Sequence, residues 1–215
     1  KVSVRLMSVG KRGMYWIRAR KGIGIARMLL VILFPHTLRA YVPLVVGTDP
    51  GDEPFPIEDL QREQYFYGVL DTTPHLYVLT STDPLLLTLR ILVPEMEGAH
   101  TDVNTIIVKR EGRQGSVVEV ARVLSRDGSW ELFREPIGGD EYKRGGGYEQ
   151  ELEPGTYFLE VSAPNNDTPY VLVVGNKEGK GDISYGDMLV RISDVKVFYG
   201  HSRLWVLESP YGYVP

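Results

Sequence analysis

Apolar and polar residues alternate in short runs along most of the chain beyond residue 60. In the run 156–161, Tyr157, Leu159 and Val161 fall on one face, and the positions between them fall on the other. A period of two residues is the spacing of a β-strand with one buried face. We therefore predict a strand here, with Tyr157 turned towards the core.

Runs of branched and aromatic residues recur between clusters of Gly, Pro, Asn and Asp. They cover residues 64–70, 75–81, 85–93, 104–109, 117–124, 129–133, 156–161, 169–175 and 188–198. Short strands with turn residues between them indicate an all-β sandwich or barrel. Leu152, Pro154, Gly155 and Tyr157 also fit the corner of a Greek-key sandwich, where a Tyr hydroxyl bonds back to the preceding turn. The predicted fold is all-β, a jelly-roll or Greek-key-like β-sandwich.

The first part of the chain differs in charge and hydropathy. Nine Lys and Arg residues and no acidic residue precede Asp49, which leaves 15 basic against 28 acidic residues from there on, a net charge of −13. The basic segment contains the apolar run Met28–Phe34, which is too short to span a bilayer but suits a secretory signal. We expect membrane association through residues 23–46 or export. A docked N-terminal segment is the alternative.

These features divide the chain into four parts. Residues 1–47 are predicted to be a signal, anchor or docking segment, and residues 48–60 a Pro/Gly/acidic linker. Residues 61–200 are predicted to form the β-sandwich. The aromatic tail 201–215 suits either a docked final strand or an approach to a membrane interface.

Candidate metal ligands are few. The chain has no cysteine, and its four histidines show no zinc-binding spacing. Calcium prefers oxygen ligands from loops, so Asp102 with Asn104 and Asp182 with Asp187 are the candidates, against the alternative that these side chains form turns. No other cofactor is predicted.

Aromatic side chains suggest a second kind of site. Trp130, Tyr142 and Tyr148 flank the glycine-rich segment 138–147, which we predict to be a flexible hairpin tip. Together they would offer a stacking surface for sugar rings. The alternative is that Trp130 belongs to the core, because it shares a strand face with Leu132.

Two further features concern modification and partners. Asn166 begins an N-glycosylation pattern that ends at Thr168, in a predicted exposed loop. The acidic charge of the main domain disfavours nucleic acid as a partner.

The region from about Tyr65 to Gly175 resembles the bacterial and archaeal pre-peptidase C-terminal domain, a jelly-roll-like β-sandwich. The resemblance rests on "LYVLTS" as an early strand, on "TDVNTIIVKREG", and on "PGTYFLEV" with "PYVLVVG" as the closing hairpin. It implies an extracytoplasmic, non-catalytic module.

The sequence thus favours an extracytoplasmic, membrane-tethered or secreted domain with an accessory, assembly or protein-interaction role in a cell-envelope complex. Its expected partners are other envelope or membrane proteins. A carbohydrate- or calcium-binding module is the alternative, and a hydrolase using dispersed carboxylates is the third hypothesis.

Overall fold

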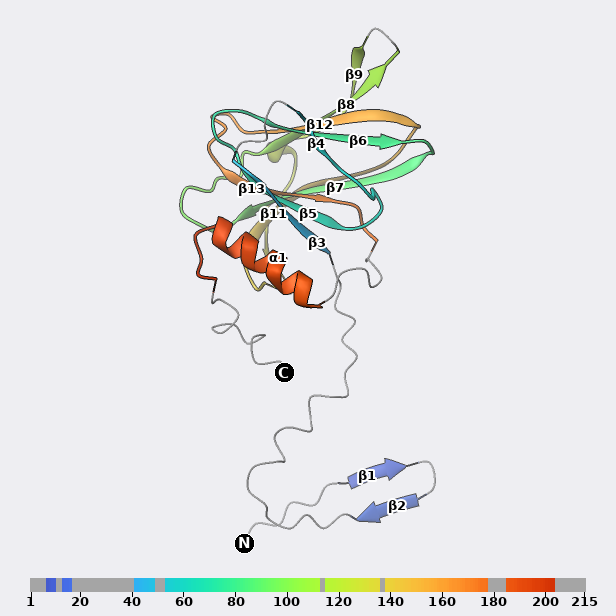
Figure 1. The fold of residues 1–215 in the computed structure, drawn as a ribbon, viewed down its shortest axis with the longest axis vertical. Helices are drawn as coiled ribbons and strands as arrows, with labels where there is room; N and C mark the ends of the chain where they lie inside the picture. Colours follow the sequence, from blue (N-terminus) through green and yellow to red (C-terminus); the bar gives the residue numbers. More distant parts are fainter. Residues whose placement is uncertain are drawn as a thin grey trace. The chain divides into compact units, whose positions relative to one another are not determined.

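The computed structural model of the chain describes residues 7–10, 13–16, 41–48, 53–112, 115–135, 138–177 and 185–203 (Figure 1). The chain divides into two compact units, residues 1–38 and 39–215. In the first unit, β1 (Met7–Gly10) and β2 (Gly13–Trp16) form an antiparallel hairpin. The apolar run Met28–Phe34 and most of the tail 201–215 lie outside the described residues.

The second unit is a β-sandwich of two mostly antiparallel sheets, which confirms the predicted fold class. The first sheet has the strand order β10 (Glu131–Arg134), β11 (Glu141–Leu152), β7 (Leu85–Pro94), β13 (Pro169–Val174), β5 (Gln64–Val69) and β3 (Val42–Gly47). The second has the order β4 (Phe55–Pro56), β6 (His75–Ser81), β12 (Gly155–Ser162), β8 (Asn104–Glu111) and β9 (Ser116–Val123). A 3₁₀ turn, η1 (Ser125–Asp127), follows β9.

The main core lies between the two sheets and follows from the alternation in the sequence. On β12, Tyr157, Leu159 and Val161 are at most 2% exposed, as predicted. The Tyr157 hydroxyl donates a hydrogen bond of 2.6 Å to the carbonyl oxygen of Glu153, so the predicted tyrosine corner is present. This bond ties β12 to the turn that leads into it.

A second core covers the outer face of the first sheet. Helix α1 (Tyr185–Phe198) packs there, and all six residues of β13 are buried because they are covered on both sides (Figure 1). Lys196 on α1 pairs with Asp140, and the Tyr199 hydroxyl donates to the carbonyl of Tyr170 at 3.1 Å. These polar contacts fix the helix against the sheet.

The strand predicted over residues 188–198 is wrong, because this segment is helical. Met188, Ile192 and Val195 are each 3% exposed and recur at the four- and three-residue spacing of a helix face. The β-branched residues between them favoured a strand, but the buried positions follow the helical period.

The glycine-rich segment 138–147 is also not a loop along its whole length. Residues 141–147 belong to β11, which pairs with β7 through an irregularity between Arg144 and Gly147. Gly145 is required there because a Cβ atom would lie 2.7 Å from the ring of Trp130. The glycines therefore allow close packing within a strand.

The sandwich begins earlier in the chain than residue 61, where the sequence analysis predicted its start. β3 pairs in parallel with β5, and β4 pairs in parallel with β6, so residues 42–47 and 55–56 are part of the sandwich. Both are edge strands, and an edge strand tolerates the prolines that led us to predict a linker. The described part of the chain contains no helix with the length and hydropathy of a transmembrane span.

Candidate functional site

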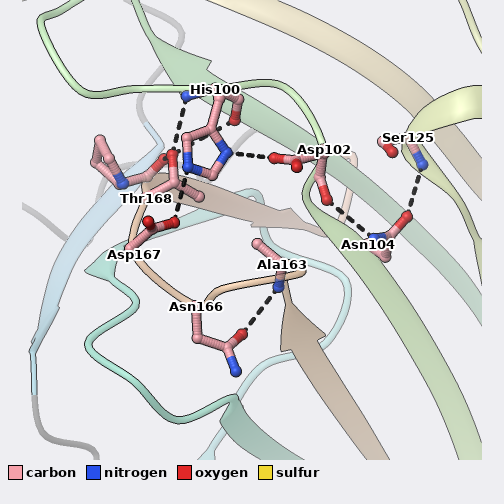
Figure 2. Close-up of polar contacts among 9 residues, drawn as sticks. His100, Asp102, Asn104, Ser125, Ala163, Asn166, Asp167 and Thr168 are labelled. Atoms are coloured by element: carbon pink, nitrogen blue, oxygen red, sulfur yellow. Dashed lines mark hydrogen bonds and ion pairs between the residues drawn. The ribbon is translucent and has the colours of Figure 1, made fainter.

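A polar cluster joins the loop before β8 to the loop before β13 (Figure 2). His100 is its centre: its Nδ1 contacts the carboxylate of Asp102, and its Nε2 lies 2.8 Å from Oδ1 of Asp167. The main-chain N–H of His100 donates to Oγ1 of Thr168 at 3.0 Å. Both ring nitrogens of His100 are thus engaged, and the cluster clasps two loops at one end of the sandwich.

The calcium candidates at this end are occupied by hydrogen bonds within the chain. Asn104 donates from Nδ2 to the main-chain carbonyl of Asp102 at 2.9 Å, and its Oδ1 accepts from the N–H of Ser125 at 2.9 Å (Figure 2). Turn-forming side chains of this kind were the alternative to a calcium site. In the described part of the chain, no three His, Asp or Glu side chains are grouped to hold a metal ion.

Of the second pair of calcium candidates, Asp182 and Asp187, the structure describes only Asp187. Asp187 lies in the first turn of α1, where a carboxylate interacts favourably with the helix dipole. Asp182 lies outside the described residues.

The glycosylation candidate Asn166 has a structural position in the loop. It adopts a left-handed backbone conformation with φ of 46°, and its Oδ1 accepts from the N–H of Ala163 at 2.9 Å (Figure 2). Thr168, the last residue of the glycosylation pattern, is fully buried. The side chains of this pattern therefore stabilise the loop.

Charge on His100 should stabilise the fold at low pH. The hydrogen bond to Asp102, followed by the one to Asp167, raises the pKa of His100 above its ordinary value. The stabilisation is therefore complete below pH about 6.5 and is lost as the pH rises through the raised pKa. Because the side chains are 38–56% exposed, we expect an effect below about 1 kcal/mol.

The measurement is the midpoint of urea unfolding between pH 5 and 9. The difference between wild type and His100→Ala should shrink as the pH rises. A difference that is independent of pH would show that the two ion pairs do not form.

The three aromatic candidates do not share one surface. Tyr142 is 1% exposed in the core beneath α1, whereas Trp130 and Tyr148 pack half-buried against the core between the sheets. Tyr142 and Tyr148 are six residues apart and would face the same way in a regular strand. The irregularity between Arg144 and Gly147 shifts this alternation, so the predicted stacking surface is not formed.

Two cavities are lined by residues that the sequence analysis did not single out as site candidates. One, of about 200 Å³, lies on the outer face of the first sheet and is lined by Tyr41, Tyr65, Arg90, Phe133 and Arg144, among others. The guanidinium of Arg144 lies 5.3 Å from the centre of the Phe133 ring and donates to Glu131 at 3.1 Å. The sequence signal near this cavity is the run of three consecutive aromatic residues in β5, residues 65–67.

The other cavity is a groove of about 310 Å³ on α1. It is lined by Leu189, Val190, Ser193, Asp194 and Arg203. The Val190 side chain is 61% exposed, one of the highest values among the large apolar residues described. This groove was missed because residues 188–198 were predicted to be a strand.

Comparison with known proteins gives no family assignment. No family matches the chain, and no curated protein matches it. One similar solved structure is the pre-peptidase C-terminal domain of collagenase from Bacillus anthracis, with a TM-score of 0.35 and 11% sequence identity over 59% of this chain and 98% of that domain. The similarity to this domain is one of fold alone.

Proposed function

We propose that this protein is a non-catalytic accessory domain of a cell-envelope complex, and that it binds a partner protein through the outer face of α1. The observation that carries the proposal is the apolar groove around Val190. This residue is far more exposed than the buried residues Met188 and Ile192 on the opposite face of the same helix.

The attachment of α1 to the sandwich supports a binding role. The helix is anchored on its inner face by three apolar residues, by the Lys196–Asp140 ion pair, and by a hydrogen bond of 3.4 Å from Arg191 to the carbonyl of Pro43. A surface held in one conformation loses little entropy when a partner binds. The groove also carries Asp194 and Arg203, which suit a polar rim around an apolar centre.

The envelope setting is proposed from the sequence. The basic N-terminal segment and its apolar run favour cytoplasmic retention of the first part of the chain, while the acidic domain is exported. Carbohydrate or calcium binding has less support, since the aromatic candidates lie on different faces and the Asp102–Asn104 pair is used within the chain.

The proposal is tested by placing a charge in the groove. Val190→Arg should release the full-length protein from a high-mass complex in solubilised native membranes, because the guanidinium would be desolvated at the interface. Leu86→Arg is the control: Leu86 is 50% exposed but lies on β7 and does not line the groove. Neither change should alter folding by more than about 0.5 kcal/mol.

Native gel electrophoresis gives the readout. We expect wild type and the Leu86 variant to migrate with the complex, and the Val190 variant to migrate alone. If the Val190 variant stays in the complex, the groove is not the binding surface.

A further inference from the structure

Strand β9 forms an open edge of the second sheet. It pairs with β8 on one side, and within the described residues no strand or main-chain hydrogen bond covers its other side. Its far end extends with β8 beyond the other strands (Figure 1). Val117 and Val118 there are 60% and 46% exposed. An exposed edge is normally protected by charges, prolines, bulges or shortening. β9 carries one charge of each sign among five apolar residues in its eight, so a strand with the same opposite charges can pair with it.

The face pattern of β9 is changed at its centre by a bulge. Glu119 pairs with Val108, and Ala121 pairs with the next residue back on β8, Ile107, which leaves Val120 as the extra residue. As a result Glu119 and Arg122 lie on the same face although they are three residues apart. Val120 and Ala121 both pack against the core on the other face.

The order of residues in this segment is symmetric about the bulge. Residues 116–125 read Ser-Val-Val-Glu-Val-Ala-Arg-Val-Leu-Ser. When this segment is reversed about the midpoint of Val120 and Ala121, serine falls on serine, each apolar residue falls on an apolar residue, and the glutamate falls on the arginine. Leu124, just beyond the strand, keeps an extended backbone with φ of −96° and ψ of 139°.

We propose that a second copy of this chain pairs antiparallel with β9 around a two-fold axis between Val120 and Ala121. The resulting pairs are Val117 with Leu124, Val118 with Val123, Glu119 with Arg122, and Val120 with Ala121, each formed twice. In every pair the two residues lie on the same face, which direct cross-strand neighbours must do. Without the bulge, this register would place Glu119 and Arg122 on opposite faces.

The charges of the edge are complementary in this register. Within one copy, Arg122 donates to both oxygens of Glu119 at 2.7 and 2.6 Å, with side chains about half exposed. In the dimer each of these two residues lies opposite its counterpart in the other copy. A two-fold axis duplicates every contact, which gives the self-complementary interface expected of a symmetric dimer. The second sheet of one copy and the second sheet of the other then form one continuous sheet.

The test uses charge reversal in the full-length protein and sedimentation equilibrium. Glu119→Arg places arginines opposite Arg122 at both positions of its own dimer, and Arg122→Glu places glutamates opposite Glu119. We expect wild type to dimerise and each variant alone to be monomeric at the same concentration. An equal mixture should dimerise again, because the mixed dimer restores both pairs of opposite charge.

The mixture separates this proposal from an effect inside one chain. Neither variant regains the Glu119–Arg122 pair within its own copy, so only contacts between copies explain recovery. Wild type that stays monomeric, variants that dimerise as well as wild type, or a mixture that stays monomeric would each overturn the proposal. If wild type is monomeric, the partner that pairs with β9 would be an extended segment of another protein.

The register is tested separately with cysteine, because the chain contains none. Glu119→Cys and Arg122→Cys proteins should form a disulfide with each other when mixed under mild oxidation, since paired Cα atoms are about 4.5–5.5 Å apart. Each variant alone should form much less, because position 119 lies about 10 Å along the strand from its own copy. Equal cross-linking in all three samples would contradict the register.

Discussion

Replacement of Tyr157 by alanine is expected to lower the free energy of unfolding by about 3–5 kcal/mol, the cost of removing a buried aromatic side chain. Tyr157 is 2% exposed between the sheets, and its hydroxyl holds the turn at Glu153. The change therefore removes packing in the main core and a hydrogen bond at the corner. The free energy of unfolding is measured by urea denaturation, with far-ultraviolet circular dichroism as the signal.

The neighbouring residue provides the matched control. Phe158 is also aromatic and lies on the same strand, but it is only partly buried, on the other face. Phe158→Ala should cost no more than about 1 kcal/mol. Tyr157→Phe separates the two contributions, because it keeps the ring and removes only the hydrogen bond, at about 1 kcal/mol. A larger loss for Phe158 than for Tyr157 would mean that the register of β12 is displaced by one residue.

Substitution of Gly175 by alanine should be similarly damaging, by roughly 3 kcal/mol or more. Gly175 follows β13 with φ of 81°, and a Cβ atom there would lie 2.3 Å from the carbonyl oxygen of Arg62. The obstacle is main chain, so it cannot move aside as a flexible side chain would. The N–H of Gly175 also donates to the carbonyl of Thr88 at 2.9 Å.

Gly98 isolates the steric part of this effect. Its φ is 80°, nearly the same as that of Gly175, but a Cβ atom at Gly98 would meet no atom within 4 Å. Gly98→Ala should therefore cost only the backbone term of about 1–2 kcal/mol. Thermal unfolding of both variants gives the comparison. Equal losses would show that the close approach to Arg62 does not occur.

The parts of the fold that the sequence predicted are those where one side of a strand is buried. Such strands show the two-residue period directly, and β6, β7 and β12 appear where the alternation placed them. The tyrosine corner was predictable too, because its bond is made within five residues of the chain. Local patterns are enough for features of this kind.

One feature that was missed, the face that each tyrosine of β11 occupies, depends on pairing between distant segments. Nothing near Tyr142 in the sequence shows that β11 has an irregularity after Arg144, yet this decides which face each tyrosine occupies. The helical period of residues 188–198 was present, but the branched side chains outweighed it in the prediction. The two cavities depend on the same helix, since one lies on α1 and the other lies on the outer face of the first sheet, against which α1 packs.

The polar cluster illustrates a further limit. Asp102 and Asn104 were predicted to be calcium ligands or turn-forming side chains, but their partners His100 and Ser125 were not predicted. Asp167 is more than sixty residues away from His100 in the sequence. Only the folded chain shows that the carboxylates are held by a histidine of the same chain.

The most direct test of the proposed role is to place a photo-reactive amino acid at position 190 of the full-length protein in native membranes. A control protein carries the same amino acid at position 86 on β7. After irradiation, we expect position 190 to give one discrete cross-linked product with a second protein, and position 86 to give none. A reaction at position 190 confined to the chain itself, or equal products from both positions, would contradict docking of a partner on α1.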